Sequence, residues 1–359
     1  MPEPVAGRWI VLSDHRRRPS PYFAQLEKYV RQAGLGMEFA SSLAEVAGPP
    51  GVVNPHRLKR LYRDQDGRPT LAGARAMLRR LRALQRAGWK VVWTLHNLYP
   101  IDVPRRRVAD LVASHGVGRL ADAILCHTRS DAAWMRRRPG VRGLVDVAGW
   151  GGLPDRAGSD VPEPVRRLVD RMAGDPRPYL LFGNVSPYKG VRTVVEAFCR
   201  AGGHDATLYV VGRCRDPETA EWLRSCGGSR VYSHLEPVPP DHAHLLYAAA
   251  AVAVCPYEVT GAQRFFRKAI FPSSVGTAVG FGVPVLAPDL PSIREMVGGH
   301  PHVLYPPREG ISEAFAGASA WSDDRQVRTP EDDGVRWSAI ARCYERTARA
   351  FTCGTDSKP

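Results

Sequence analysis

The strongest constraint on the fold is a rhythm of short apolar runs and amphipathic segments that occurs twice along the chain. The apolar run of residues 8–13 precedes a helical pattern at 22–32, and a helical pattern at 71–87 precedes the apolar run 90–95. The rhythm restarts after residue 177 and continues for about six further units. Because strands that alternate with helices predict parallel sheets, we expect an α/β fold with two doubly wound, Rossmann-like domains.

A segment rich in glycine, proline and charged residues, Gly149–Arg177, separates the two halves. This composition is typical of an interdomain connection. Its position predicts an N-terminal domain of residues 1–160 and a C-terminal domain of residues 161–334, followed by an amphipathic helix at 335–352. The length of 359 residues also favours two cores over one.

The charge balance predicts a surface that attracts anions, because the net charge is +14 and the pI is about 9.8. Three arginine triplets, Arg16–Arg18, Arg105–Arg107 and Arg136–Arg138, all lie in the N-terminal half. Peripheral association with the inner face of the cell membrane is one hypothesis, and a surface that only keeps the protein soluble is the alternative. We expect no nucleic-acid partner, since the aromatic and glycine signatures of RNA-binding modules are absent from the sequence.

Cysteine usage and hydropathy indicate the cellular compartment in which the protein is expected. The seven cysteines form no Cys-x-x-Cys pair, so neither a disulfide framework nor a zinc site is expected. The sequence contains no apolar run of about 18 residues, and its N-terminus lacks the basic-then-apolar order of a signal peptide. These features predict a cytoplasmic protein.

A loop with glycine at both ends follows the apolar run 179–182. Residues 183–190 read Gly-Asn-Val-Ser-Pro-Tyr-Lys-Gly, and a helical pattern comes next. Ligands of parallel sheets bind beyond the carboxyl ends of the strands, where helix N-termini present free N–H groups to anions. Lys189 adds a point charge that suits a phosphate, so the loop predicts a phosphate site. An ordinary solvated lysine is the alternative.

Over residues 182–198 the sequence FGNVSPYKGVRTVVEAF resembles the donor-side loop of the retaining nucleotide-sugar glycosyltransferases with the GT-B fold, particularly family 4 and its relatives. Further segments resemble that family in the same order along the chain: 19–22, 93–100, 208–213, 231–235, 244–257 and 276–289. The resemblance implies two Rossmann-like domains that face a cleft, with the C-terminal helix returning to the N-terminal domain. It implies transfer of a sugar from a nucleoside-diphosphate sugar to a hydroxyl of a saccharide, a lipid-linked saccharide or a natural product, with no metal and no cofactor.

The resemblance also implies the residues of the site. Lys189 aligns with the lysine that contacts the donor diphosphate, and it joins His96 and Asp102 as an expected catalytic residue. The expected donor-binding residues are Gly183, Asn184, Ser186, Lys189, Gly212, Arg213, His234, Tyr257, Glu258, Ser273, Ser274, Gly276 and Thr277. The expected acceptor-binding residues are Ser13, Arg16, Tyr22 and Asn97.

The chain departs from the family at a pair of glutamates eight positions apart, of which the second usually holds the donor ribose. The two positions fall on Ala269 and Thr277, or on Glu258 and Phe266 if the pair is counted from the earlier glutamate. We expect the Ser273–Thr277 turn to bind the diphosphate through N–H groups and hydroxyls instead, with Glu258 as the remaining carboxylate for the ribose. The segment between, Val259–Phe271, is interpreted either as a flap over the phosphates or as an insertion that packs its aromatic residues.

Retention of configuration is the expected outcome, because the leaving phosphate itself then deprotonates the acceptor. Inversion would need a base, for which His96 and Asp102 are the first candidates. A core position for His96 and a helix-capping position for Asp102 are the alternatives. Two rival functions stay open: a sugar-nucleotide epimerase of the same fold, and a binding protein without catalytic activity.

Overall fold

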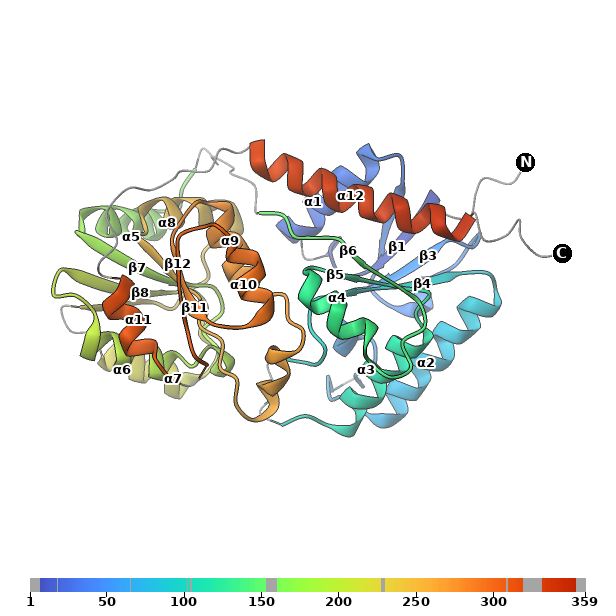
Figure 1. Cartoon of the computed structure of the whole chain (residues 1–359), viewed down its shortest axis with the longest axis horizontal. Helices are drawn as coiled ribbons and strands as arrows, with labels where there is room; N and C mark the ends of the chain where they lie inside the picture. The colour runs from blue at the N-terminus through green and yellow to red at the C-terminus, as the bar shows by residue number, and fades with distance from the viewer. Residues whose placement is uncertain are drawn as a thin grey trace. The chain divides into compact units, whose positions relative to one another are not determined.

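The computed structural model describes residues 7–17, 19–64, 66–101, 103, 105–152, 160–226, 230–307, 309–318 and 331–352. The chain forms two compact units (Figure 1). Unit 1 comprises Met1–Gly151, Lys268–Phe271 and Gly334–Pro359, and unit 2 comprises Gly152–Arg267 and Pro272–Asp333. The predicted α/β class is confirmed, because each unit holds a six-stranded parallel sheet flanked by helices. The predicted domain boundaries at 160/161 and 334/335 stay predictions.

The sheet of unit 1 has the strand order β2-β1-β3-β4-β5-β6. Its strands are β1 (Arg8–Leu12), β2 (Gly36–Ala40), β3 (Val52–Pro55), β4 (Lys90–Leu95), β5 (Ala123–Cys126) and β6 (Leu144–Val147). The chain runs from β1 to β2 on one side and then crosses to the other side of β1 to form β3. A topological switch point therefore lies between β1 and β3, and the loops that follow these two strands diverge there.

The helices of unit 1 form where apolar residues recur every three to four positions. They are α1 (Pro21–Gln32), α2 (Leu71–Arg86), α3 (Val108–Leu120), α4 (Arg129–Arg136) and α12 (Glu331–Thr352), with short 3-10 turns η2 (Leu43–Glu45) and η3 (Leu58–Arg60). Helix α2 begins where the Thr70 hydroxyl accepts a hydrogen bond from the Gly73 N–H at 3.0 Å. It ends before Gly88, whose φ of 91° suits glycine.

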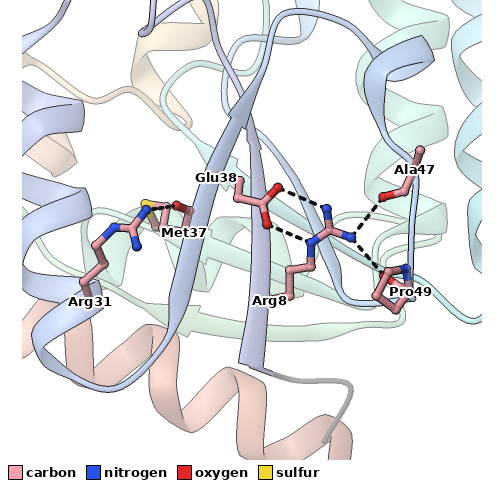
Figure 2. Close-up of polar contacts among 6 residues, drawn as sticks. All are labelled: Arg8, Arg31, Met37, Glu38, Ala47 and Pro49. Carbon is pink, nitrogen blue, oxygen red and sulfur yellow. Dashed lines mark hydrogen bonds and ion pairs between the residues drawn. The ribbon is translucent and has the colours of Figure 1, made fainter. Parts of the chain in front are cut away.

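Arg8 fixes the edge of this sheet (Figure 2). Its Nε and Nη2 donate to the two carboxylate oxygens of Glu38 at 2.9 and 3.0 Å, joining β1 to the edge strand β2. Its Nη1 donates to the carbonyl oxygens of Ala47 and Pro49 at 2.9 and 3.1 Å. The hydrogen bond from Arg8 lowers the pKa of Glu38, so this pair stays ionised at neutral pH.

The last helix, α12, completes the core of unit 1. Trp337, Ile340 and Tyr344 are buried in the same cluster as Trp9 of β1, and the Trp9 and Tyr344 ring centroids lie 4.7 Å apart. Gly151 lies against the Trp337 ring so closely that a Cβ on Gly151 would overlap it. The end of the chain is thus part of the N-terminal unit's interior.

The sheet of unit 2 has the strand order β12-β11-β10-β7-β8-β9. Its strands are β7 (Arg177–Phe182), β8 (Ala206–Val211), β9 (Val231–His234), β10 (Val252–Val254), β11 (Val285–Pro288) and β12 (His302–Tyr305). The chain runs from β7 through β8 to β9, then returns to the other side of β7 to form β10. The switch point of unit 2 therefore lies between β7 and β10.

Helices cover both faces of this second sheet (Figure 1). They are α5 (Glu163–Gly174), α6 (Val191–Ala201), α7 (Pro217–Ser225), α8 (Ala243–Ala249), α9 (Ser273–Gly280), α10 (Pro291–Val297) and α11 (Ile311–Ala318), with 3-10 turns η4 (Pro187–Lys189), η5 (Pro240–His242) and η6 (Gly261–Arg267). The rings of Tyr179, Phe198 and Phe315 join β7, α6 and α11, with centroids 5.3 to 5.7 Å apart. This contact brings the last helix of the unit back onto the first strand.

Candidate functional site

The loops after β7, β8 and β9 are held side by side by backbone hydrogen bonds. Gly183 N donates to Val211 O at 3.0 Å, and Gly212 N donates to His234 O at 2.8 Å. Gly212 has a φ of 128°, and a Cβ at this position would overlap the Gly183 carbonyl oxygen. Both the backbone conformation and the close approach therefore require glycine. The predicted donor residues Gly183, Gly212 and His234 do lie together at one edge of the sheet.

Lys189 lies at the end of η4, directly before α6, and its side chain is only 5% exposed. Its Nζ donates to the Phe182 carbonyl oxygen at 2.8 Å, and within the described residues it forms no ion pair with a carboxylate. Burial lowers the pKa of Lys189 to about 8. An unpaired buried ammonium is costly, so this position is suited to a ligand that brings negative charge.

The loop after β10 lies beside the Lys189 loop. Glu258 N donates to Tyr188 O at 2.7 Å, and the Glu258 carboxylate accepts from the Thr260 hydroxyl at 2.9 Å. A Cβ on Gly190, which precedes α6, would lie 3.8 Å from a Glu258 carboxylate oxygen. Glu258 is exposed and lies in the loop that follows β10, at the switch point between β7 and β10.

The predicted Ser273–Thr277 turn is the first half of α9, which begins at Ser273. Ser274 bonds to the buried Tyr257 through their hydroxyls at 2.8 Å, and Thr277 Oγ1 donates back to the Ser273 carbonyl at 2.9 Å. The Ser273 side chain is exposed, whereas Gly276 is buried. Val275 N and Gly276 N donate to the Pro272 carbonyl oxygen at 2.9 and 3.2 Å, so an anion at this helix start would be bound through the exposed Ser273 end and the helix dipole.

The remaining predicted donor residues lie on the same loops. Asn184 and Arg213 are exposed, and Ser186 is partly buried. Val185 N donates to Arg213 O at 3.0 Å, so the two loops continue in parallel past the glycines.

The segment Val259–Phe271 packs its aromatic residues. Phe265 and Phe266 are 2% and 0% exposed, and the Phe266 ring lies 5.8 Å from that of Tyr257. Ala269, one of the positions where the family has glutamate, is fully buried. The interpretation as a packed insertion is therefore the one that the described contacts favour.

Unit 1 has a small cavity of about 60 Å³ at its own switch point. Its lining residues are Leu12, Ser13, Asp14, Ser20, Phe23, His56, Arg57 and Arg60. Arg60 donates to Asp14 at 2.5 Å across the cavity's rim. Ser13, an expected acceptor residue, thus lines a cavity, whereas Arg16 is exposed beyond it. Asp102 lies outside the described residues, so its predicted role stays a prediction.

Three histidines form a continuous chain at the carboxyl ends of β3, β4 and β5. His127 Nδ1 lies 2.8 Å from Gly149 O, and His127 Nε2 lies 3.2 Å from His96 Nδ1. His96 Nε2 lies 2.9 Å from His56 Nδ1, and His56 Nε2 lies 2.9 Å from the Asn54 side-chain oxygen. Both ring nitrogens of His96 therefore face another histidine.

Tyr22 and Phe271 cover this histidine chain. The Tyr22 ring lies edge-on to His96 with centroids 5.2 Å apart, and the Phe271 ring stacks on His127 at 3.9 Å. Phe271 N also donates to His96 O at 2.7 Å, and Asn97 pairs with Ile270 in an isolated bridge. The expected acceptor residues Tyr22 and Asn97 thus adjoin the expected catalytic residue His96.

Burial lowers the pKa of each histidine in the chain. The pKa of His56 and His96 falls well below the usual 6.5, and that of His127 falls to about 4. The neighbouring histidines and Arg57 lower the pKa of His56 and His96 further. The chain is therefore neutral at pH 7 in the free protein.

The comparisons with known proteins give two results: a sequence match within unit 2 and structural matches over most of the chain. Residues 177–321 match the family model described as glycosyl transferases group 1. Among solved structures, sucrose-phosphate synthase from Thermosynechococcus elongatus has a TM-score of 0.56 at 15% identity, and the match covers 96% of this chain and 94% of that chain. The chain has the GT-B glycosyltransferase fold. No curated protein sequence matches it.

Two further GT-B structures extend the comparison. The alpha,alpha-trehalose 6-phosphate synthase from Burkholderia multivorans has a TM-score of 0.58 at 14% identity, covering 93% of this chain and 76% of that chain. HepE from Anabaena, in complex with UDP, has a TM-score of 0.53 at 16% identity, covering 96% and 95%. The family model confirms the predicted resemblance to group 1 glycosyltransferases over residues 177–321, and the solved structures confirm the predicted fold.

The predicted donor residues stay predictions, and sequence reasoning missed one end of the histidine chain. His56 and Asn54 were not singled out, although His56 follows its strand as closely as His96 and His127 follow theirs. That shared position, one residue past a buried strand, is the signal for His56, whereas Asn54 lies inside β3 and has no such signal. In the part of the chain that the structure describes, no three His, Cys, Asp or Glu side chains are grouped to hold a metal ion.

Proposed function

We propose that this GT-B protein transfers a sugar from a nucleoside-diphosphate sugar to a hydroxyl of a saccharide, a lipid-linked saccharide or a natural product. The observation that carries the proposal is Lys189, a buried ammonium with no carboxylate partner among the described residues, placed before α6 at the switch point of unit 2. A Cβ on Gly183 would lie 3.3 Å from the Lys189 Nζ, so glycine at this position leaves room beside the ammonium. A diphosphate supplies the charge that this ammonium lacks.

Transfer of the sugar requires that the protein stabilise the diphosphate as it leaves. As the anomeric C–O bond breaks, its electrons move to the diphosphate, and negative charge grows on the oxygen that leaves. Lys189, the N–H groups that begin α6 and α9, and Arg213 are the groups of unit 2 suited to stabilise it. These groups are cations and amide dipoles, so we propose transfer without a metal ion. Retention of configuration follows if the leaving phosphate takes the proton of the acceptor.

A uridine nucleotide is the first candidate donor. HepE was crystallised with UDP-glucose, and a trehalose-6-phosphate protein from E. coli with UDP-2-fluoro glucose. Both have this fold at 14% and 10% identity. Their ligands support testing UDP-sugars before GDP-, ADP- and dTDP-sugars.

The test of the proposal measures nucleotide release. The protein is incubated with each nucleoside-diphosphate sugar, with and without a panel of hydroxyl acceptors, and the free nucleoside diphosphate is quantified. We expect acceptor-dependent release that falls at least a hundredfold in Lys189→Ala, since such a charge contact contributes several kcal/mol to the transition state. Lys90→Ala, which removes a lysine at the far end of β4, is the control with unchanged turnover. Conversion of the donor without any acceptor would support the epimerase instead.

We also propose that unit 1 docks on an anionic membrane through the outer face of α2 and α3, called here the arginine face. The face consists of Arg75, Arg79, Arg82, Arg86, Arg105, Arg107, Val108, Leu111 and Arg119, which are all exposed. Helices α2 and α3 pack against each other (Figure 1). None of these arginines forms an ion pair within the described residues, and Asp110, the acid of α3, is buried against Tyr62.

Two exposed aliphatic side chains favour lipid over nucleic acid as the partner of the arginine face. Val108 and Leu111 are 64% and 38% exposed on α3, beside the arginines. Aliphatic side chains insert among lipid tails, whereas single-stranded nucleic acids stack on aromatic rings. None of the described helices is long and apolar enough to cross a bilayer.

Vesicle sedimentation tests the membrane proposal. At low salt we expect the protein to sediment with vesicles that contain phosphatidylglycerol and to stay in solution with phosphatidylcholine alone. Val108→Asp should weaken sedimentation about tenfold or more, while the control Val335→Asp, at an equally exposed valine on α12, should not. Wild-type protein that stays in solution with anionic vesicles, or that binds an RNA probe instead, contradicts the proposal.

A further inference from the structure

The cavity at the switch point of unit 1 is lined by two loops that diverge there. The loop from β1 to α1 contributes Ser13, Asp14 and Ser20, and the segment after β3 contributes Arg57 and Arg60. Open parallel sheets bind their ligands in the crevice at such a point. The residues proposed to bind the donor all belong to unit 2, so this cavity in unit 1 is suited to a second ligand.

The described lining of the cavity carries a net positive charge. Arg57 and Arg60 are both exposed, and Asp14 is the single carboxylate among the described lining residues. Arg60 donates to Asp14 at 2.5 Å, which offsets that carboxylate. His56 adds no charge at pH 7, because burial holds its pKa well below the ordinary 6.5. Two guanidinium groups against one carboxylate therefore attract an anion to the cavity.

The start of α1 adds hydrogen-bond donors to these arginines. Ser20 is the N-cap of α1, but its hydroxyl accepts no hydrogen bond from the helix. Pro21 has no N–H, and among the described residues neither Tyr22 N nor Phe23 N donates to a backbone oxygen. Free N–H groups and the helix dipole favour negative charge at a helix start. Because Ser20 and Phe23 line the cavity, this helix start belongs to the same site.

The loop between β1 and α1 has a fixed shape without any ligand. Ser20 N donates to His15 Nδ1 at 3.0 Å, and Arg17 N donates to Asp14 O at 3.0 Å. The His15 ring packs against the Phe39 ring, with centroids 4.7 Å apart. A preformed site loses little conformational entropy on binding, so more of the interaction energy appears as affinity.

The size of the cavity limits what it can enclose. Its volume is about 60 Å³, and a single water needs about 10–15 Å³ on the same scale. The cavity thus holds about five atoms of that size, which matches a phosphate group and is too small for a sugar ring. Its donors come from Ser13, from the start of α1 and from the segment with Arg57. Donors placed on three sides suit a tetrahedral phosphate better than a planar carboxylate.

We propose that the acceptor carries a phosphate monoester, and that this cavity binds it through Arg57, the Ser13 and Ser20 hydroxyls and the first N–H groups of α1. The inference rests on the proposed sugar transfer and names the class of its acceptor, a phosphorylated saccharide whose sugar ring stays outside the cavity. A phosphate diester, such as that of a lipid headgroup, would bring a second substituent that this volume does not hold.

Calorimetric titration with inorganic phosphate at pH 7 tests the site without any turnover. The full chain carries Lys189→Ala in every sample, so that this lysine of unit 2 does not contribute. We expect saturable binding at one site, and at least tenfold weaker binding when Arg57→Gln is added. Arg342→Gln, at an exposed arginine of α12, is the matched control and should change the affinity by less than about twofold. Absence of phosphate binding, or equal affinities of the two variants, overturns the proposal.

Two further probes separate phosphate monoesters from other anions. Acetate represents a carboxylate and dimethyl phosphate represents a diester, and we expect each to bind at least tenfold more weakly than inorganic phosphate. Equal binding of acetate would contradict the choice of phosphate. Equal binding of dimethyl phosphate would contradict the choice of a monoester and favour a lipid-type group.

A substitution at Asp14 should act in the opposite direction from the one at Arg57. Asp14→Asn removes the carboxylate that competes with the anion for Arg60, so phosphate should bind severalfold more tightly. An effect on loop structure alone would weaken binding in both variants. Weaker binding by Asp14→Asn would therefore contradict the electrostatic role of the lining.

Steady-state kinetics with the wild-type Lys189 connect the cavity to transfer. At saturating donor, inorganic phosphate should inhibit competitively with the acceptor. Arg57→Gln should raise KM for the acceptor at least tenfold and change kcat by less than about threefold, because the phosphate contact is the same in the ground state and the transition state. Inhibition that the acceptor does not relieve would contradict the assignment to the acceptor. If no donor supports transfer, the proposed function fails, whereas the phosphate titration still decides what the cavity binds.

Discussion

At the scale of the residue, Lys189 shows how a binding site reduces stability. The folded protein holds this lysine at a pKa of about 8, whereas the unfolded chain has the ordinary 10.5. Between these pH values the unfolded state binds more protons, so stability rises as the pH rises from about 8 to 10.5. Below pH 8 the protein carries the full cost of the buried charge.

Lys189→Met should therefore stabilise the protein while it removes turnover. At pH 7 we expect a gain on the order of 3 kcal/mol in the free energy of unfolding, which disappears by pH 10.5 as the wild-type lysine loses its proton. Urea unfolding at pH 7 and pH 10.5 measures the difference. The exposed Lys28→Met on α1 is the control and should change stability by less than about 0.5 kcal/mol at both pH values. A Met variant less stable than the wild type at pH 7 would show that the ammonium is not held at a cost.

At the scale of the element, the donor-side loops depend on two glycine backbones in contact. Gly212 follows β8 with a φ of 128°, and any Cβ there would overlap the Gly183 carbonyl oxygen. Gly149 follows β6 with a φ of 82° and has no atom within 4 Å of the place of a Cβ. A side chain would strain the backbone at both positions because of the positive φ. Only at Gly212 would its Cβ also overlap a neighbouring atom.

Gly212→Ala should lower the free energy of unfolding by about 3 kcal/mol or more. Gly149→Ala should lower it by about 1 kcal/mol, from backbone strain alone. Thermal unfolding with and without UDP measures both effects. We expect Gly212→Ala to lose the stabilisation that UDP gives as well, because the shifted loop carries Gly183 and Lys189 out of place. Equal destabilisation by the two variants would contradict the importance of the contact.

The elements also show which local signals sequence reasoning can read. Strands β1, β4 and β7 were predicted because each is a compact apolar run next to a helical pattern. The strand β3 (Val52–Pro55) was missed, because its four residues include Asn54 and Pro55, which are uncommon in strands. Its burial comes from pairing with β1 and β4, which a local pattern does not contain. Asn54 and His56 were missed with it, since both are placed at the site by that strand.

At the scale of the whole molecule, the chain's last helix completes its first unit. Trp337 of α12 is 2% exposed and lies against Tyr22, Tyr29 and Gly151. Tyr344 of the same helix bonds to Thr94 at 3.1 Å. The amphipathic pattern of α12 predicted a helix, and only the family resemblance implied that it returns to the N-terminal domain, because contacts between residues so distant in sequence leave no local signal.

Trp337→Ala should destabilise unit 1 by about 3–5 kcal/mol through the cavity it leaves. Val335→Ala is the control, because this valine on the same helix is 67% exposed. It should change the free energy of unfolding by less than about 0.5 kcal/mol. Chemical unfolding monitored by tryptophan fluorescence measures both. Because the substitution lies in the core of unit 1, we expect UDP still to bind unit 2; a parallel loss of UDP binding would contradict the division into two cores.

Binding of a nucleoside diphosphate beside Lys189 is the central feature of the proposed function. Calorimetric titration of UDP into the full chain at pH 7, followed by GDP, ADP and dTDP, tests this directly. We expect saturable binding of at least one of these nucleotides at a single site, and at least tenfold weaker binding by Lys189→Ala. Absence of binding by all four, or equal affinity of the wild type and the variant, would contradict the account.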